Sequence, residues 1–183
     1  MLREFSAGGV VVRPLSGRWV LAAIAPHRDS PQANSSAKKK SPSSPLLALP
    51  KGLVDPGEDP CQAAVREVRE ETGLTANLIT KLRDIKYFYV RSWGDGERVF
   101  KIVSFYLLQY GSGEIDDISP EMRIEVARAM WLPLEEGHTR LTYRSEREVV
   151  RLAAEYVKSH PELAHGADLG EPTAGLKSPP AMT

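Results

Sequence analysis

The sequence is poor in the features that would mark a secreted, membrane-bound or polyanion-binding protein. A single cysteine, Cys61, in 183 residues excludes an internal disulfide and is compatible with a reducing compartment. The 24 Lys and Arg residues balance 24 Asp and Glu residues, so no net charge draws the chain to nucleic acid or to a membrane surface. The longest apolar run, residues 19–25, is too short to cross a bilayer. The first residues lack a signal-peptide pattern, and we expect a cytoplasmic protein.

Two stretches contain almost no large apolar side chains and mark the expected domain boundaries. Residues 28–45 are rich in Ser, Pro and Lys, a composition typical of a mobile surface insertion. Residues 159–183 are rich in Pro, Gly and Ala, a composition typical of a disordered C-terminal tail. We expect residues 1–158 to form one domain, because a long surface insertion costs little loop entropy.

The remaining residues alternate between strand and helix patterns. Runs of β-branched and apolar residues predict strands at residues 5–13, 18–25, 46–49, 78–90, 99–110 and 129–132. A Pro-Leu-Ser-Gly turn joins the first two runs into a hairpin, and Trp-Gly-Asp-Gly forms a turn between the fourth and the fifth. Helices are predicted at residues 59–72 and 145–158. This order favours the α/β class, with a mixed sheet covered by helices on both faces.

Both predicted helices carry end signals and an apolar stripe. In the first helix Asp59 is the N-cap, Pro60 is the first helical residue and Gly73 follows the last turn. The second helix carries a Ser-x-x-Glu capping box at Ser145 and Glu148. The stripes at helical spacing are Cys61, Ala64, Val65 and Val68 in the first helix, and Val149, Leu152, Ala153, Tyr156 and Val157 in the second.

Three glutamates crowd the last turns of the first helix. Glu67, Glu70 and Glu71 follow i, i+3, i+4 spacing. A helix therefore holds them on one face, about 115° from the apolar stripe and at the edge of a cleft. These carboxylates repel one another and lie at the negative end of the helix dipole. Such a cluster needs a compensating cation, and carboxylate oxygens suit Mg²⁺ or Mn²⁺, so the trio predicts a metal site for phosphate chemistry.

The region around this trio resembles the Nudix family. From Gly52 the sequence reads Gly, five residues, Glu, seven residues and Arg-Glu-Val-Arg-Glu-Glu-Thr-Gly-Leu, which fits every fixed position of the Nudix box. Ala-Gly-Gly-Val at residues 7–10, Leu-Pro-Lys-Gly at 49–52 and Trp-Leu-Pro-Leu-Glu-Glu at 131–136 extend the similarity over roughly residues 3–158. The resemblance implies an α/β/α sandwich with a mixed central sheet flanked by helices.

The resemblance also implies roles for the box residues. Its candidate ligands for a divalent metal, Mg²⁺ or Mn²⁺, are the backbone carbonyl of Gly52 and the side chains of Glu67, Glu70 and Glu71. Arg66 lies one turn before Glu70 and can hold that carboxylate in a fixed rotamer. Glu58 and Gly73 are structural box residues, and Glu58 is expected to brace the loop before the helix.

The implied activity is metal-dependent hydrolysis of a phosphoanhydride bond in a nucleoside diphosphate linked to another group. A divalent metal neutralises the phosphate charge and lowers the pKa of the attacking water, and a glutamate can accept the proton. Glu67 is the candidate base inside the box. Outside the box the first candidate is Glu125, six residues before Trp131, and the second is Glu121.

Residues outside the box are expected to select the substrate. Leu-Pro-Lys-Gly at residues 49–52 and Leu-Thr-Tyr-Arg at 141–144 look similar to branches that cleave dinucleoside polyphosphates or oxidised nucleoside triphosphates. The candidate phosphate contacts are Lys51, His27 and Arg28, because each added phosphate brings charge that needs a partner. Tyr87 and Tyr143 are candidates to stack on a nucleobase, although strand aromatics are more often core residues.

Alternatives to these assignments stay open. ADP-ribose, inositol pyrophosphates and capped RNA are alternative substrates, and a non-catalytic ligand-binding module is an alternative role. The expected partner is a small nucleotide, with no membrane and no double-stranded nucleic acid. The sequence is compatible with a monomer or a homodimer.

Overall fold

A six-stranded sheet forms the centre of the protein, whose computed structural model describes residues 1–27, 45–91 and 96–164. The elements in chain order are β1 (Leu2–Leu15), β2 (Arg18–Pro26), β3 (Lys51–Leu53), α1 (Pro60–Thr72), β4 (Thr75–Val90), β5 (Arg98–Ser112), β6 (Val126–Pro133), α2 (Leu134–Arg140) and α3 (Arg144–Ser159). Short 3₁₀ turns occupy Met122–Ile124 (η2) and Pro161–Ala164 (η3).

The sheet is mixed, as the sequence predicts. Its strand order is β4-β5-β1-β2-β6, and β3 pairs with β1 beside this path. Strands β1 and β5 run parallel, from Leu2 opposite Val99 to Val12 opposite Gln109. The other pairs are antiparallel. The parallel pair places the N-terminal strand at the centre of the sheet.

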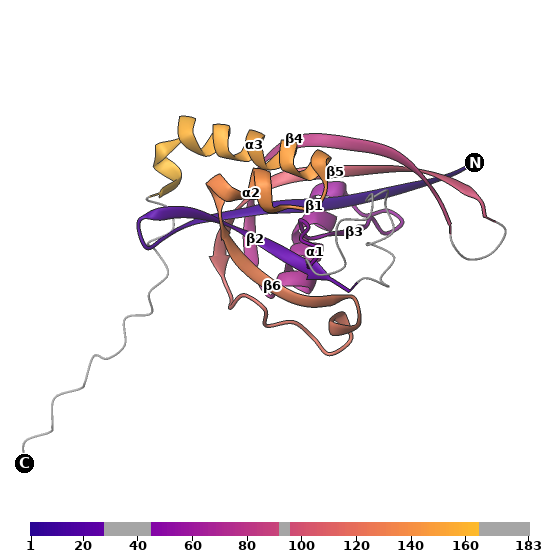
Figure 1. Cartoon of the computed structure of the whole chain (residues 1–183), viewed down its shortest axis with the longest axis horizontal. Helices are drawn as coiled ribbons and strands as arrows, with labels where there is room; N and C mark the ends of the chain where they lie inside the picture. Colours follow the sequence, from indigo (N-terminus) through magenta and orange to yellow (C-terminus); the bar gives the residue numbers. More distant parts are fainter. Residues whose placement is uncertain (28–44, 92–95, 165–183) are drawn as a thin grey trace, which may run out of the picture.

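Helices cover both faces of this sheet, with α1 on one side and α2 and α3 on the other (Figure 1). Alternate residues of β1 point to opposite faces. Val10 belongs to the core cluster that includes Val149 of α3. Val11 belongs to a separate cluster with Val68 of α1. The predicted α/β/α sandwich is therefore confirmed.

The strand predictions hold in position but differ in extent. The first hairpin is confirmed, and Ser16 and Gly17 turn the chain with positive φ angles of 50° and 78°. The strand predicted at 46–49 is wrong, because only Ala48 forms an isolated bridge there, with Ile24. The strand in this region is β3, which pairs with residues 6–8 of β1. Most of the predicted Trp-Gly-Asp-Gly turn lies outside the described residues.

Helix α1 begins and ends where its local signals predict. The side chain of Asp59 accepts a hydrogen bond from the backbone N–H of Cys61 at 2.9 Å. Gly73 ends the helix with φ 80°, a left-handed conformation that glycine adopts without a steric penalty.

The predicted capping box of the last helix is wrong. Helix α3 begins at Arg144, and its N-cap, Tyr143, makes no side-chain capping hydrogen bond. The Glu148 side chain instead binds Arg83 of β4 at 3.2 Å and lies 3.5 Å from Arg144. The Glu148 side chain, which the capping box requires, is therefore used in an ion pair with another strand. Helix α2 was not predicted.

The described structure continues past residue 158, where the tail was expected to begin. Helix α3 ends at Ser159, η3 follows, and the Leu163 carbonyl accepts a hydrogen bond from the Gln109 side chain at 2.9 Å. The insertion predicted at 28–45 lies outside the described residues except for its last residue, and the tail lies outside them beyond residue 164.

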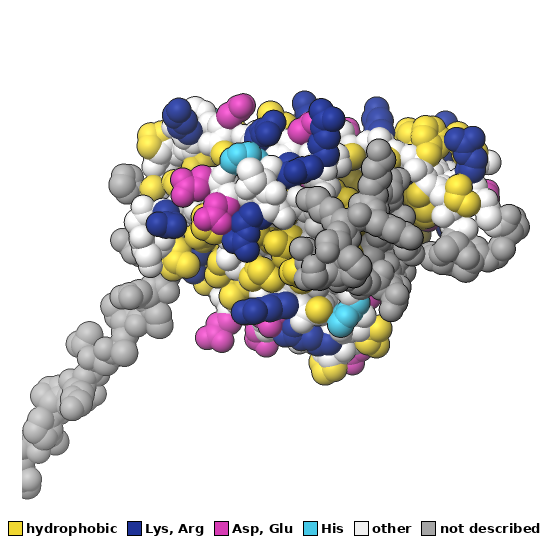
Figure 2. Space-filling model, in the orientation of Figure 1, with side chains coloured by type: hydrophobic (Ala, Val, Ile, Leu, Met, Phe, Trp, Pro, Cys, Tyr) yellow, Lys and Arg dark blue, Asp and Glu magenta, His cyan; other side chains and the backbone are white. Residues whose placement is uncertain are grey.

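Strands β4 and β5 extend past the helices beside the N-terminal end of β1 (Figure 1). Phe5, Phe88 and Val90 are 52%, 49% and 59% exposed on this extension, and apolar side chains are visible at that end of the surface (Figure 2). None of the helices in the described part of the chain combines the length and apolar character that a membrane span requires.

Candidate functional site

Arg66 connects three of the predicted site glutamates. Its Nε and Nη2 donate to the two carboxylate oxygens of Glu58 at 2.9 and 2.8 Å. Its Nη1 donates to Glu67 at 2.7 Å and to Glu70 at 3.2 Å. The expected contact between Arg66 and Glu70 is therefore present, but the bidentate contact, with two parallel hydrogen bonds, joins Arg66 to Glu58.

The pKa values of Glu58 and Glu67 shift in opposite directions, because burial outweighs the contact with Arg66 only at Glu67. The hydrogen bonds from Arg66 lower the pKa of Glu58 to about 2. Burial raises the pKa of Glu67, with further increases from the charges of Glu70 and Glu125, although Arg66 opposes this rise. Glu67 is thus a buried carboxyl group whose charged form is disfavoured, and a cation bound beside it would favour that form.

The three clustered glutamates do not share one environment, contrary to the expectation that they flank the buried face together. Glu67 and Glu71 are 7% and 1% exposed, whereas Glu70 is on the surface. The buried face of α1 consists of Ala63, Ala64, Glu67, Val68, Glu71 and Thr72, and the predicted stripe residues Cys61 and Val65 are only half-buried. The helix is rotated toward its acidic side because protein groups compensate the buried charges.

Strand β3 supplies that compensation. The backbone N–H of Lys51 donates to Glu71 at 2.8 Å. The next residue, Gly52, lies directly against Glu67, and a Cβ atom at this position would overlap the Glu67 carboxylate. Glycine is therefore required here for close approach, which explains why the box begins with this residue.

The residues fit a divalent metal in their chemistry, although they are not grouped as a ready metal site. Within residues 1–27, 45–91 and 96–164, no three or more His, Cys, Asp or Glu side chains are arranged to hold a metal ion. The carboxylates nevertheless supply hard oxygen donors next to the Gly52 backbone, where a side chain would leave no room. Arg66 is the cation that neutralises Glu67 and Glu70 in this structure.

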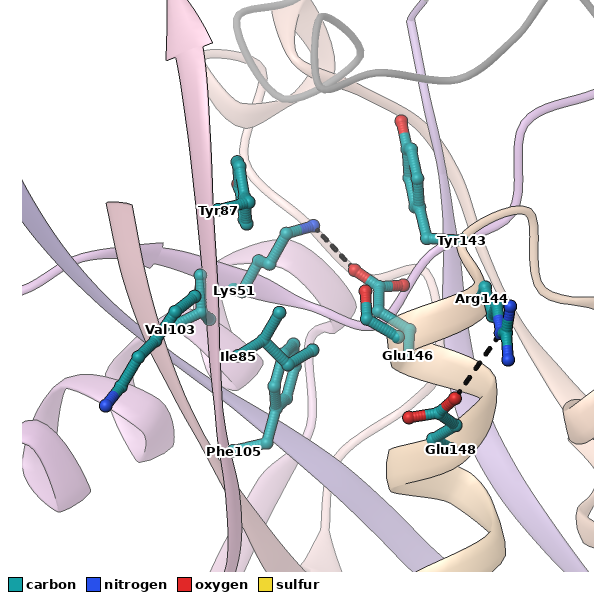
Figure 3. A pocket seen from close by; sticks show the side chains of 11 residues that line it. Lys51, Ile85, Tyr87, Val103, Phe105, Tyr143, Arg144, Glu146 and Glu148 are labelled. Carbon is teal, nitrogen blue, oxygen red and sulfur yellow. Dashed lines mark ion pairs between the residues drawn. The ribbon is translucent and has the colours of Figure 1, made fainter. Parts of the chain in front are cut away.

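A cavity of about 350 Å³ lies beside β3 on the opposite face of the sheet. It is lined by Lys51, Tyr87, Val103, Phe105, Tyr143 and Glu146, among others. Tyr87 of β4 and Tyr143 before α3 stand on opposite sides of the cavity (Figure 3). The structure thus brings together three of the residues predicted for substrate binding: Lys51, Tyr87 and Tyr143.

Lys51 is buried, whereas a loop lysine is exposed by default. Its side chain is 9% exposed, and its Nζ lies 3.1 Å from Glu146 Oε1 and 5.8 Å from the Tyr143 ring centroid. Burial lowers the pKa of Lys51, but the attraction of Glu146 and Glu71 outweighs burial and raises the pKa overall. Lys51 is therefore a fixed positive charge at the cavity wall.

The other predicted residues outside the box, His27, Glu121 and Glu125, lie together around η2 and are not among the residues that line this cavity. His27 is exposed, its backbone N–H donates to the Glu125 carbonyl at 2.9 Å, and its Nε2 lies 3.1 Å from the Arg123 carbonyl. Glu121 and Glu125 are exposed at the two ends of η2. Glu125 is close enough to raise the pKa of Glu67. Arg28 lies outside the described residues.

Sequence reasoning missed Glu146, which is 2% exposed in the first turn of α3. A usable signal was present, because Glu146 shares helical spacing with Val149, Val150 and Ala153. A charged residue on an apolar stripe indicates a buried partner elsewhere in the chain.

Comparison with known proteins identifies the family. A sequence model of the NUDIX domain matches residues 10–153. A putative mutator protein, MutT4, from Mycobacterium tuberculosis is 35% identical over 156 residues, covering 85% of this chain and 56% of that protein. The asymmetrical bis(5'-nucleosyl)-tetraphosphatase of Mus musculus is 30% identical over 118 residues, covering 61% of this chain and 72% of that protein.

The curated relatives differ in length from this chain, and solved structures share its fold. The chain spans about half of the Mycobacterium tuberculosis protein and 29% of an 8-oxo-(d)GTP phosphatase from Mycolicibacterium smegmatis. A crystal structure of a C. elegans Ap4A hydrolase binary complex matches with a TM-score of 0.56 and 23% identity, covering 85% of this chain and 98% of that one.

Proposed function

Because the chain belongs to the NUDIX domain family, we propose that it hydrolyses a phosphoanhydride bond in a nucleoside diphosphate linked to another group. The observation that carries this proposal is the contact of one guanidinium, that of Arg66, with Glu58, Glu67 and Glu70. On an ordinary solvent-exposed helix rich in Glu and Arg, one arginine is not expected to bind three glutamates at once, because water solvates each side chain separately.

We assign the divalent metal, Mg²⁺ or Mn²⁺, to Glu67, Glu70 and Glu71 with the Gly52 carbonyl. A bound divalent metal would neutralise phosphate charge and lower the pKa of water. The chain's own residues set the frame for this chemistry. Arg66 and Glu58 fix the loop before α1, and Gly73 closes the helix. Hydrogen bonds that orient ligands contribute about 10–100-fold to metal affinity or activity in metal sites.

A glutamate accepts the proton from the attacking water. The candidates are Glu67 inside the box and Glu125 outside it, with Glu121 as the second candidate outside the box. Burial of Glu67 and the negative charge of Glu125 both raise the pKa of the Glu67 carboxyl group. A base variant should lose kcat while retaining its affinity for Mn²⁺ alone, whereas a ligand variant should lose both. Comparing Glu67→Gln with Glu125→Gln in these two measurements separates the roles.

For the substrate we propose a dinucleoside polyphosphate or a (d)NTP. Tyr87 and Tyr143 flank a cavity of about 350 Å³, and a nucleobase stacked there would leave the phosphates near Lys51. The names of the relatives, a tetraphosphatase and an 8-oxo-(d)GTP phosphatase, support the same class. His27 and Arg28 stay candidates for more distant phosphates. The cytoplasmic setting and the choice between monomer and homodimer stay predictions.

The test is a panel of substrates with Mg²⁺: diadenosine tetraphosphate, 8-oxo-dGTP, ADP-ribose and 5'-triphosphorylated RNA, with Glu70→Gln as control. We expect turnover of one of the first two that depends on Mg²⁺ and falls at least about 100-fold in the variant. Equal turnover in the variant would contradict the site. Stoichiometric binding of one of these nucleotides without turnover would favour a ligand-binding module instead. A structural neighbour, the NUDIX domain of Shewanella oneidensis NrtR, is complexed with ADP-ribose.

A further inference from the structure

Two buried carboxylates meet the segment before Gly52 from opposite faces of the sheet. On the α3 side, Glu146 Oε2 accepts the Leu49 N–H at 2.9 Å and Oε1 lies 3.1 Å from Lys51 Nζ. On the α1 side, Glu71 Oε2 accepts the Lys51 N–H at 2.8 Å. Figure 3 shows the Lys51 side chain pointing toward Glu146, and both residues line the cavity. Residues 49–51 are therefore held between two helices.

The segment has little freedom to move between these contacts. Glu71 and Glu146 are 1% and 2% exposed, so neither carboxylate can exchange its partners for water without local opening. On β1, a Cβ atom added to Gly8 would lie 2.6 Å from Lys51 Cβ, which shows how closely β3 packs. Close packing transmits a displacement rather than absorbing it.

Gly52 follows this segment directly and has no space between its backbone and Glu67. A shift of Leu49 or Lys51 would therefore move the Gly52 backbone relative to the carboxylate proposed as a metal ligand. The side chain on α3 that binds Leu49 and Lys51 is thus connected to α1 through residues 49–52.

We propose that Glu146 is a positioning residue, which aligns Lys51 and Gly52 with the acidic end of α1 while touching neither the metal nor the reacting phosphate. This assignment rests on the proposed function. It predicts that a change on α3 weakens metal binding on the other face of the sheet. A purely structural ion pair between Glu146 and Lys51 predicts lower stability with unchanged metal binding in the folded protein.

The first test is Glu146→Gln in the full chain, with Glu155→Gln on the exposed side of α3 as the matched control. The amide keeps the size of the side chain but replaces one of the two oxygens, which face Leu49 and Lys51 separately, by an NH2 donor, so one of the two contacts is lost. We expect the dissociation constant for Mn²⁺ alone, measured by electron paramagnetic resonance, to rise about 10-fold. We also expect kcat to fall about 10-fold with a smaller change in KM, and the control to match wild type.

Glu146→Asp keeps the test decisive if the amide variant fails to fold. The shorter carboxylate withdraws from the Leu49 N–H, which the backbone holds in place, whereas a change of rotamer lets the long Lys51 side chain keep its ion pair. Weakened Mn²⁺ binding in a variant with a native-like melting curve supports positioning. Wild-type Mn²⁺ affinity and wild-type kcat in folded Glu146→Asp or Glu146→Gln would overturn it. A wild-type protein that neither binds Mn²⁺ nor turns over any substrate would instead overturn the proposed function, and this assignment with it.

Discussion

Arg66 binds Glu58 in a bidentate contact, in which Nε donates to Oε1 at 2.9 Å and Nη2 donates to Oε2 at 2.8 Å. The same Nη2 donates to the Leu53 carbonyl at 2.9 Å. One planar guanidinium thus ties the end of β3 and the loop after it to α1. The fixed fork of arginine suits this geometry, and an ammonium group cannot reproduce it.

Arg66→Lys should therefore behave as a severe change despite the conserved charge. We expect the free energy of unfolding to fall by about 1.5–3 kcal/mol, the range for hydrogen bonds to charged groups. Urea denaturation followed by circular dichroism measures this loss, and Arg69→Lys, at an exposed position of the same helix, is the control. Equal stability of the two variants would show that the fork adds nothing beyond its charge.

Glu58 makes the stability of the protein sensitive to acid. Its pKa falls from an ordinary value of 4.5 to about 2 in the folded protein, first through the hydrogen bonds from Arg66. Between these values the unfolded chain binds more protons, so the stabilisation is complete above about pH 4.5 and disappears as the pH falls through about 2.

Glu58→Gln should consequently be less stable than wild type at pH 6, with a gap that narrows as the pH falls below about 4.5. Urea denaturation at a series of pH values measures the gap. Glu155→Gln should run parallel to wild type over the same range. A Glu58→Gln gap that is constant down to pH 2 would mean that the paired carboxylate is not what titrates.

Local signals account for the parts of the fold that the sequence predicts well. Asp59, Pro60 and Gly73 define α1 because capping and helix termination depend on neighbours within one turn. Helix α2 escaped prediction because Gly137 in its middle reads as a helix breaker. A Cβ there would lie 2.6 Å from Leu21 and 2.8 Å from Val150, so close packing explains this glycine.

The full burial of two charged side chains, Glu71 and Glu146, was not predicted. From the sequence, Glu71 is expected at the edge of a cleft and Glu146 has no assigned role, because charged residues are rarely fully buried. Their partners, Lys51 and the backbone N–H groups of Leu49 and Lys51, lie 20 or more residues away along the chain, and local patterns do not encode such contacts. The box residues themselves were found because a family resemblance already encodes those distant contacts.

The contact between Gly52 and Glu67 gives a matched pair of glycine variants. Gly52→Ala drives a methyl group into the Glu67 carboxylate, and overpacking of this kind costs about 1–3 kcal/mol. Gly57 has φ 82° with nothing within 4 Å of an added Cβ, so Gly57→Ala costs about 1–2 kcal/mol through backbone strain alone. Both variants should melt at lower temperature, but only Gly52→Ala should lose kcat and Mn²⁺ affinity. Equal losses of kcat would assign the effect to general destabilisation.

Tyr87 and Tyr143 should act on substrate binding more than on chemistry. Replacing either by Leu removes a stacking surface, and we expect KM for the nucleotide to rise about 10-fold with little change in kcat. The corresponding Phe variants retain the ring and should keep KM near wild type. Phe88→Leu is the control, because Phe88 is the next residue of β4, points to the opposite face and is 49% exposed. Steady-state kinetics on the preferred substrate measures all five variants. An unchanged KM in both leucine variants, or a rise in KM for Phe88→Leu as large as that for Tyr87→Leu, would contradict binding of the nucleobase in this cavity. Lys51 would then be the one candidate substrate contact among Lys51, Tyr87 and Tyr143.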